Sequence, residues 1–498
     1  MGDDNQFTRR GFIAGGALAG AAALVPSPIE RVIRAISEGA IRKAYAAETV
    51  GEGARNYVNI LMPGAPLRYA FDAWMRTKDS DPALIFNPMV VNRYSAGAGK
   101  VNGVYHSTFN YRGTLVPHMF SQNVFKSSGG GLVARPLTDL LDHMMVIRGY
   151  GSGLDGHPFN VTIQQSPVGG ASSVAGLAAD YSTKAFEAVE WPDRATYSNY
   201  NSVKAKALNK VYGAKPLNAL LEGFGAPGAD RLKGRSVKDR NREAFDLAQA
   251  RLKAYANSDN AGSLILAKNL TNAADLLKKG IGNIDGYWNG AVARYRSVIE
   301  TSMQQSGLLG ISDVPMISDE TPMWNFHKLE GNIGMTLSST YDARGLIASA
   351  KFSDRENSIS VLAEGLALTE YVLKENLVSA INLQTGELAN LSTIPVGGAL
   401  QMHILPNDMH FLGTYPAVLM MTSFYRGLAA GMLELIDQLK KTKVNGTDLW
   451  SETVVQVLSD FNRTARIDGS GSDHGFNQMV TSVYSGAIKS PTVVGNIY

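Results

Sequence analysis

The run Thr453-Val-Val-Gln-Val-Leu458 leads directly into Ser459-Asp460-Phe461-Asn462-Arg463-Thr464. Its β-branched first part, residues 453–458, predicts a strand, and its polar second part predicts a loop at the end of that strand. A long helical pattern at residues 417–441 and a strand-like pattern at residues 399–405 come before it. A strand, a helix and a strand in this order predict a parallel pair joined by a crossover helix. We therefore expect an α/β fold in which strands 399–405 and 453–458 end at the same edge of one sheet.

Other strands and a further helix are expected in the same domain. Residues 358–373 have helical periodicity, and three apolar runs predict strands at residues 56–62, 144–148 and 377–383. The first run ends at Pro63-Gly64-Ala65-Pro66, a turn made by two prolines and a glycine. The second run is followed by a long glycine-rich loop, residues 149–158. In α/β folds, ligand sites form in such loops at the carboxyl ends of strands.

Residues 180–305 have a different character, with helical periods rich in Ala, Leu, Lys and Asn. This pattern predicts a helical layer or insertion within a single domain that spans residues 47–498. The basic stretch at residues 231–242 is more typical of a solvated helix face than of a docking site for an anionic partner.

The first 46 residues have the features of a twin-arginine signal peptide. Arg9 and Arg10 precede an uncharged run at residues 11–25, and Ala44-Tyr45-Ala46 is a small-x-small cleavage pattern. The run is shorter than the roughly 20 apolar residues of a membrane-spanning helix, so we expect no permanent transmembrane anchor. These features predict export in the folded state by the twin-arginine translocation machinery and cleavage by signal peptidase after residue 46. The mature protein is expected to be periplasmic or secreted.

The composition limits both the partners and the chemistry. The chain of 498 residues is 45% hydrophobic, which is enough for a large core. Its first 46 residues hold six basic and four acidic residues, so the net charge of +3 falls to +1 without them, and binding to nucleic acid is not expected. The chain has no cysteine and eight histidines, which limits any metal site to His, Asp and Glu ligands. Such ligands favour Zn, Mn, Mg or Ca.

Two Asp/His pairs follow two of the predicted strands. Asp408 and His410 come shortly after strand 399–405, and Asp473 and His474 follow strand 453–458 in a segment rich in Gly and Ser. Side chains two residues apart in an extended segment point the same way, and adjacent side chains in a turn can reach one point. The two pairs could hold one divalent ion, or two ions roughly 4 Å apart. A single pair of this kind is more often a capped turn with a hydrogen-bonded histidine, so both interpretations stay open.

Several motifs resemble, in order and spacing, those of a secreted bacterial family called domain of unknown function 1501. This family carries a twin-arginine signal and belongs to the alkaline phosphatase and sulfatase-like clan. It has a Trp-Asp-Thr-His step, a long helix, a Ser-Glu-Phe-Gly-Arg-Thr strand end and a Gly-x-Asp-His turn. The corresponding segments here are Asp408-Met409-His410, the helical pattern, residues 459–464 and Gly471-Ser472-Asp473-His474. The resemblance covers residues 364–498 and, more weakly, residues 61–72.

The resemblance implies an alkaline-phosphatase-like three-layer α/β/α sandwich with a mostly parallel sheet and an inserted helical region. It also implies a divalent metal at the carboxyl edge of the sheet, held by the residues that match the motifs: Asp408, His410, Asp473 and His474. Two looser matches add candidate ligands. His157 stands where relatives have a histidine after an early strand, and Asp72 is the one acidic residue that remains after the first predicted turn.

The chain departs from the family pattern where a nucleophile is sought. Relatives begin with Gly-Gly-Pro-Ser followed by acidic residues, whereas this chain has Pro63-Gly64-Ala65-Pro66-Leu67, with no serine. The Glu and Gly of the later family motif are Asp460 and Asn462 here. The nucleophile is therefore unassigned, since nothing singles out a hydroxyl among Ser107, Thr108 and Thr114.

Two functions are expected from these features. The first is a metal-dependent hydrolase of phosphate or sulfate esters, in which Arg463 stabilises the anionic transition state. The second is a non-catalytic member that keeps the fold and binds an envelope or cell-surface component. The missing serine favours the second function, and the two ligand pairs favour a metal in either case.

Overall fold

The computed structural model describes residues 56–68, 71–73, 75–77, 108–166, 172–180, 182, 184, 188–191, 200–202, 209–210, 284–304, 356–385, 394–396, 400–402, 414–444, 446–465, 472–475 and 478–495. The predicted signal peptide and the basic stretch at residues 231–242 lie outside these residues. Asp408, His410 and Ser107 lie outside them as well.

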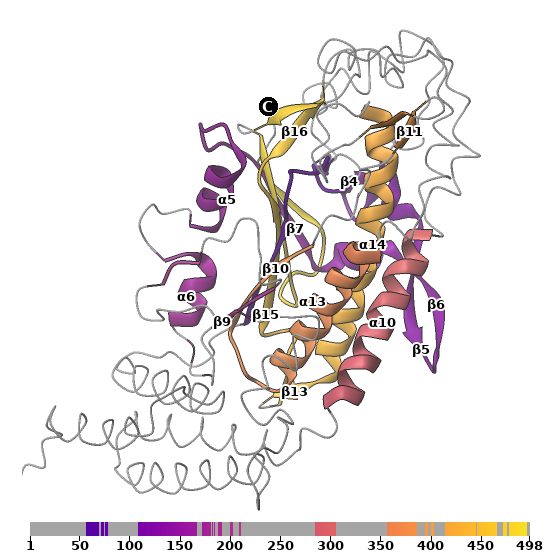
Figure 1. Ribbon diagram of the computed structural model, residues 1–498, viewed down its shortest axis with the longest axis vertical. Coiled ribbons are helices and arrows are strands. Elements are labelled where there is room, and N and C mark those ends of the chain that lie inside the picture. The colour runs from indigo at the N-terminus through magenta and orange to yellow at the C-terminus, as the bar shows by residue number, and fades with distance from the viewer. Residues whose placement is uncertain are drawn as a thin grey trace, which may run out of the picture. The chain divides into compact units, whose positions relative to one another are not determined.

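One mixed sheet forms the centre of the fold (Figure 1). Seven strands lie in the order β19 (Thr492–Val494), β7 (Met144–Tyr150), β18 (Met479–Ser485), β15 (Thr453–Ser459), β1 (Asn56–Met62), β10 (Ala380–Gln384) and β8 (Ala188–Trp191). Two residues of β9 (Asn209–Lys210) extend the sheet beyond β8. Strand β18 is antiparallel to both of its neighbours, and the other pairs are parallel. The predicted α/β fold with a mostly parallel sheet is thus confirmed.

Helices cover both faces of this sheet (Figure 1). On one face lie α5 (His157–Gln165) and α6 (Val174–Asp180), and on the other lie α10 (Ile284–Gln304), α13 (Glu356–Lys374) and α14 (Thr414–Lys441). The helices predicted at residues 358–373 and 417–441 correspond to α13 and α14. No helix in the described part of the chain is long and apolar enough to span a bilayer.

Strand residues alternate between the two helical layers, as the pleat requires. Tyr57, Ala188 and Ala380 occupy one register row and pack against Ala175 and Ala179 of α6. Further along the strands, side chains of the same face pack against α5. Burial on both faces explains why all seven residues of β1 are buried.

Glycines let the helices of the other layer approach closely. A Cβ added to Gly431 of α14 would lie 2.6 Å from Cδ1 of Leu366, and one added to Gly427 would lie 2.5 Å from Cγ of Met303. Both distances are too short for a real Cβ, so a side chain at either position would force Leu366 or Met303 to move, and glycine lets α14 pack on α13 and α10 as it does.

A buried charged network ties the same three helices together. Glu370 and Glu434 are each 1% exposed, and Arg294 pairs with both of them, at 3.1 Å from Nε to Oε1 of Glu434. Lys374 Nζ lies 2.6 Å from the other oxygen of Glu370, and Ser127 donates a hydrogen bond of 2.7 Å to Glu434. The two carboxylates are therefore paired, as buried charges must be.

The remaining elements are short. They are β2 (Arg76–Thr77), β3 (Thr108–Tyr111), β4 (Thr114–Pro117), η2 (His118–Ser121), β5 (Asn123–Ser128), β6 (Gly131–Pro136), η3 (Leu137–His143), β11 (Ile394–Val396), β12 (Leu400–Met402), β13 (Lys443–Val444), β14 (Thr447–Asp448), β16 (Asn462–Ala465) and β17 (Ser472–Gly475). The strands among them form small sheets of two or three strands, separate from the central one.

Two sequence predictions differ from the structure. The predicted pairing of strands 399–405 and 453–458 is wrong, because β12 pairs antiparallel with β11, only a short turn away. Strands β1 and β18 are the neighbours of β15 in the sheet. The parallel strand that precedes α14 in the central sheet is β10, so the crossover connection runs from β10 to β15 and passes over β1. Residues 180–305, predicted to be helical, contain strand β8, whose four residues are too few to show against the surrounding helical pattern.

Candidate functional site

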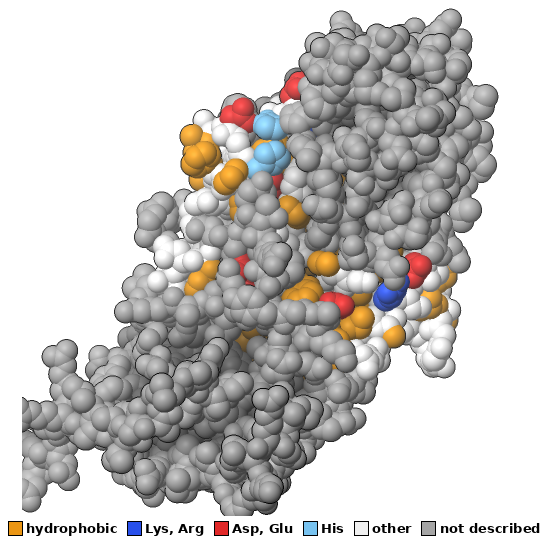
Figure 2. All heavy atoms as spheres, in the orientation of Figure 1, with side chains coloured by type: hydrophobic (Ala, Val, Ile, Leu, Met, Phe, Trp, Pro, Cys, Tyr) orange, Lys and Arg blue, Asp and Glu red, His pale blue; other side chains and the backbone are white. Residues whose placement is uncertain are grey.

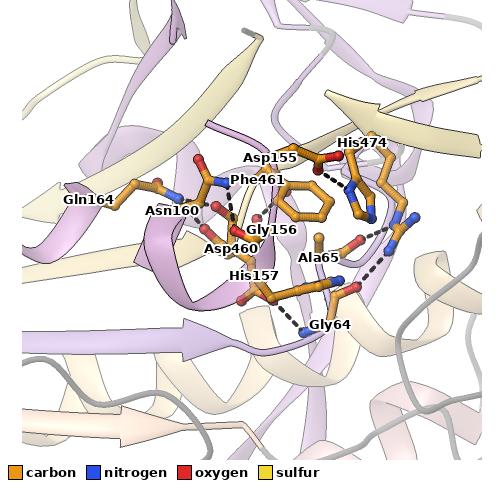
Figure 3. A network of polar contacts seen from close by, with 12 residues as sticks. Gly64, Ala65, Asp155, Gly156, His157, Asn160, Gln164, Asp460, Phe461 and His474 are labelled. Carbon is orange, nitrogen blue, oxygen red and sulfur yellow. Dashed lines mark hydrogen bonds and ion pairs between the residues drawn. The ribbon is translucent and has the colours of Figure 1, made fainter. Parts of the chain in front are cut away.

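Three loops meet at one edge of the sheet. Strands β1, β7 and β15 run in the same direction, so the segments that follow Met62, Tyr150 and Ser459 leave the sheet at the same edge. Met62 and Ser459 are register partners, which brings residues 63–66 next to residues 460–463. Hairpin β16–β17 then folds back and pairs Arg463 with His474. Side chains from all of these segments meet in one network (Figure 3).

The first contact in this network joins His157 to Asp460. His157 is the first residue of α5, and Asp460 directly follows β15. His157 Nδ1 lies 2.5 Å from Asp460 Oδ2, which also accepts a hydrogen bond of 3.0 Å from the backbone N–H of Gly64. Asp460 is fully buried, and its Oδ1 has no hydrogen-bond partner among the described residues. Burial raises the pKa of Asp460, while the bonds from His157 and Gly64 oppose that shift.

The second contact joins His474 of β17 to Asp155 in the loop after β7. His474 Nδ1 lies 2.5 Å from Asp155 Oδ1, and this hydrogen bond lowers the pKa of Asp155. Unlike Asp460, the Asp155 side chain is 68% exposed. A carboxylate only accepts hydrogen bonds, so Nδ1 is the donor in both pairs, and the neutral tautomer that donates from Nδ1 has its lone pair on Nε2.

The two imidazoles lie against each other and against one buried aromatic ring. The ring centroids of His157 and His474 are 5.2 Å apart, and the rings are nearly perpendicular. The Phe461 ring lies 4.7 Å from His157 and 4.2 Å from His474, and Phe461 is fully buried. Each histidine side chain is 21% exposed. The two imidazole rings therefore pack against the buried Phe461 ring and remain partly exposed to solvent.

The turn after β1 is held by Arg463. The guanidinium donates hydrogen bonds to the backbone oxygens of Ala65, at 2.5 Å, and Gly64, at 3.0 Å. Both of these residues have positive φ, +86° at Gly64 and +52° at Ala65, and this conformation costs roughly 1–2 kcal/mol for a residue with a Cβ. Arg463 is fully buried, so its position differs from the expected one facing an anionic transition state. It acts on the site by clamping the turn whose Gly64 N–H binds Asp460.

Helix α5 is anchored so that His157 points at Asp460. The side-chain amide of Gln164 donates to the backbone oxygens of Ser459 and Asp460, and Gln164 in turn accepts a hydrogen bond of 2.8 Å from the hydroxyl of Tyr150. At the start of the helix, Asn160 donates to the backbone oxygen of Gly156 at 2.8 Å (Figure 3). These bonds join α5 to the ends of β7 and β15.

Asp72, a weaker candidate ligand, lies in a buried ion pair. Asp72 and Arg68 are both fully buried, with Arg68 Nε 2.8 Å from Asp72 Oδ1 and Nη2 bound to Oδ2. Ser482 also donates to Oδ2, and Arg68 donates to the backbone oxygen of Val480 at 2.9 Å. Both carboxylate oxygens of Asp72 are therefore engaged in the core.

Asp473 and His474, expected to reach one point from a turn, are instead consecutive residues of strand β17. Side chains of consecutive strand residues point to opposite faces, so the exposed Asp473 does not accompany His474 toward His157. In the part of the chain that the structure describes, no three His, Asp or Glu side chains lie close enough together to hold a metal ion. Asp408 and His410, the other predicted pair, lie outside that part.

Comparison of the chain with protein-family models, with curated proteins and with solved structures finds no match.

Asp155 and Phe461, which contact the histidines directly, were not predicted as site residues from the sequence. Asp155 stands in the glycine-rich loop, two residues before His157, and its partner is more than 300 positions away, at residue 474. Phe461 is one letter of the motif at residues 459–464 and has no polar group. The position of Asp155 in a loop at a strand end was the one available signal.

Proposed function

We propose that this protein is an exported, metal-binding hydrolase of phosphate or sulfate esters, related to the alkaline phosphatase and sulfatase-like clan. One observation carries the proposal: two imidazoles, each oriented by a carboxylate, lie 5.2 Å apart at the carboxyl edge of a mostly parallel sheet. Helices on both faces of that sheet are compatible with an alkaline-phosphatase-like three-layer sandwich. The motifs at residues 408–410, 459–464 and 471–474 support membership of the family called domain of unknown function 1501. Residues 1–46 support export by the twin-arginine machinery, cleavage by signal peptidase, and a periplasmic or secreted location.

The side chains of the site suit a divalent metal. A histidine whose Nδ1–H is held by a carboxylate is the usual form of a metal-binding histidine, with Nε2 as the ligand atom. In this proposal His157 and His474 bind the ion together with Asp408 and His410. Asp460 and Asp155 give the site negative charge, and Arg463 is hydrogen-bonded to the backbone of the turn after β1. Binding of an anionic ester therefore requires a cation in the site. When bound, Zn, Mn, Mg or Ca polarises the ester and lowers the pKa of a coordinated water.

The residues of this chain orient and shield the site. Asp460, fixed by the Gly64 N–H, holds the ring of His157 in one orientation, and Arg463 holds the turn that carries Gly64. Asp155 does the same for His474 from the solvent side. Phe461 keeps water from the inner side of both rings, since it is fully buried against them.

A second candidate function is a non-catalytic protein that binds an envelope or cell-surface component. It is favoured by the turn after β1, where residues 63–67 contain no hydroxyl side chain in the place of the family's serine. In this case the metal and the histidine pair serve binding alone.

Metal analysis and turnover together test both candidates. Exported protein is purified without chelator, its metals are counted by mass spectrometry, and hydrolysis of 4-nitrophenyl phosphate and 4-nitrophenyl sulfate is measured. The hydrolase predicts at least one divalent ion per chain and turnover that falls by about 100-fold or more in His474→Ala, but not in His143→Gln, a histidine elsewhere in the fold. Metal without turnover supports the non-catalytic function. Protein that carries no metal contradicts both.

A further inference from the structure

A row of polar side chains crosses the central sheet in its interior. Its members are register partners on four neighbouring strands: Gln456 of β15, Asn59 of β1, Asn382 of β10 and Glu190 of β8. Asn59 and Glu190 are each 1% exposed, and Asn382 is 6% exposed. Strand positions that helices cover are normally apolar, so three buried polar side chains side by side need a physical reason.

The rows on either side show which face of the sheet the asparagines occupy. Tyr57, two residues before Asn59, packs against α6 together with Ala380, two residues before Asn382. Leu61, two residues after Asn59, packs against α5. Because side chains along a strand alternate between the two faces, Asn59 and Asn382 both point to the face that α5 and α6 cover.

Glu190 points to the same face as the asparagines. Its neighbour Trp191 donates a hydrogen bond of 3.0 Å to the backbone oxygen of Val361 in α13, on the opposite face of the sheet. Consecutive strand residues point to opposite faces, so Glu190 faces the α5 and α6 layer. The row therefore places a carboxylate beside two amides within one buried layer.

The amide oxygens of the two asparagines are not used by the fold. Oδ1 of Asn59 and Oδ1 of Asn382 are buried and have no hydrogen-bond partner among the described residues. Gln456 in the same row is satisfied, because it accepts from the hydroxyl of Tyr57 at 2.5 Å and donates to Thr481 Oγ1 at 3.4 Å. A buried oxygen without a partner is costly, so these two oxygens call for a donor or a cation.

The composition of the row favours a cation. Neighbouring strands lie about 4.8 Å apart, so the side chains of Asn59 and Asn382 can contact one ion between them, and the longer Glu190 side chain can reach it from the next strand. Amide and carboxylate oxygens, without nitrogen or sulfur, are the ligands of hard cations. One carboxylate balances one positive charge, and a monovalent ion therefore leaves the least net charge in the interior.

We propose that Asn59, Asn382 and Glu190 bind an alkali cation, Na⁺ or K⁺, and that this ion stabilises the folded protein. The site is separate from the histidine pair. Asn59 lies three residues before Met62, the end of β1, which is roughly 10 Å from the edge where the loops meet. Figure 2 shows histidine side chains at the molecular surface with acidic side chains nearby, whereas the alkali site is buried. The two proposals therefore stand or fall independently.

Thermal unfolding in different salts tests the site. The melting temperature of the purified exported protein is measured in NaCl, KCl and choline chloride at equal ionic strength, since choline is too large for a buried site. We expect at least one alkali salt to raise it by about 2 °C or more over choline, with a response that saturates as the salt concentration increases. Asn59→Leu removes one ligand oxygen and should abolish this difference. Asn123→Leu is the matched control, because Asn123 is exposed on β5 and its replacement should leave the difference unchanged.

A change of charge gives a second test that does not depend on losing an interaction. Asn59→Asp has nearly the same shape and adds a second carboxylate, which should shift the preference toward a divalent ion. We expect CaCl₂ to raise the melting temperature of this variant by about 2 °C or more beyond its effect on the wild type. A calcium effect equal to that on the wild type would contradict contact between the ion and residue 59.

The salt series can also overturn the inference on the unmodified protein. Equal melting temperatures in all three salts would refute the alkali site and would leave Lys210, the register partner of Glu190 on β9, as the positive charge of this row. An alkali response that persists in full in Asn59→Leu would show that the ion binds elsewhere. Neither result bears on the histidine pair, and loss of turnover in the ester assay does not bear on this site.

Discussion

Replacing Asp460 by asparagine should separate the stability of this fold from the function of its site. Asp460 is fully buried, its Oδ1 has no hydrogen-bond partner among the described residues, and burial raises its pKa. Its Oδ2 accepts from His157 Nδ1 and from the Gly64 N–H. Asparagine has the same shape, and its amide oxygen can accept both of these bonds. The change therefore removes a buried charge and leaves the bonding pattern in place.

The expected change in the free energy of unfolding is small. Removing one partner of a buried ion pair usually costs about 3–5 kcal/mol, because the other charge is left unpaired. Here the partner is an imidazole, which needs no counter-charge in its neutral form, so that cost does not apply. An amide N–H₂ placed at the position of Oδ1 costs up to about 1–3 kcal/mol if it finds no acceptor, and the relief of the buried charge offsets that cost. We expect a net change within about 1 kcal/mol at pH 7.

The same variant should lose function, because an amide orients His157 less strongly than a carboxylate does. Loss of such a partner typically lowers metal affinity or activity by about 10–100-fold. Stability is measured by urea unfolding, and function is measured by metal content and by hydrolysis of 4-nitrophenyl phosphate. A loss of more than about 3 kcal/mol would show that Asp460 is a structural anchor, and unchanged metal content and turnover would show that Asp460 does not act in the site.

The pH dependence of stability gives an internal check on Asp460. Its pKa in the folded protein is raised above the ordinary value of 3.8, so between these two values the folded state holds the proton and the unfolded state does not. The stabilising contribution is therefore present below pH 3.8 and is lost as the pH rises through the folded pKa. Asp460→Asn is expected to remove this decline, and an identical pH profile in both proteins would contradict the assigned shift.

Three further predictions concern other residues. Arg294→Met leaves the buried carboxylates of Glu370 and Glu434 without their shared cation, and urea unfolding should show a loss of about 3–5 kcal/mol; a loss below about 1 kcal/mol would contradict the network. Asp473→Asn should leave metal content unchanged, since the side chain points away from His474, and a parallel loss of metal would restore Asp473 as a ligand. Burial lowers the pKa of His143 from 6.5 to about 4, so the unfolded state binds the proton first and stability should decline as the pH falls from 6.5 toward 4. His143→Gln should flatten that decline, and a profile as steep as the wild type would refute the assignment.

Most elements of the central sheet could be predicted from local pattern. The apolar runs at residues 56–62, 144–148 and 453–458 became β1, β7 and β15, because a continuous apolar run of this length is typical of a strand in a sheet that helices cover on both faces. Strand β8 could not be predicted, since four residues within a helical context carry too little periodicity. The pairing of residues 399–405 with β15 failed for a different reason. Chain order does not reveal that β1, almost 400 residues earlier, takes the place beside β15.

The sequence predicted the edge of the sheet at which these polar residues lie, but it did not predict all of the residues that contact one another there. The rule that ligand sites form in loops at the carboxyl ends of strands pointed to the segment that holds His474 and to the glycine-rich loop at residues 149–158, and the family resemblance singled out His157 in that loop. It could not assign their partners, because Asp155 and Asp460 are each more than 300 positions from the histidine that they bind. Arg463 was expected to face an anionic group because its charge is visible in the sequence. Its burial against the Ala65 carbonyl is not visible there.

Local sequence pattern is sufficient to predict the α/β class of this chain, its main strands and helices, and the edge of the sheet at which its polar residues lie. These properties depend on periodicity, turn residues and the direction of parallel strands, all of which act over short distances along the chain. The pairing of each imidazole with its carboxylate, the outward position of Asp473 and the clamping role of Arg463 depend on strand order and on hairpin β16–β17. Contacts of this kind join residues hundreds of positions apart. They exist only after burial of the core has brought three loops to one edge of the sheet.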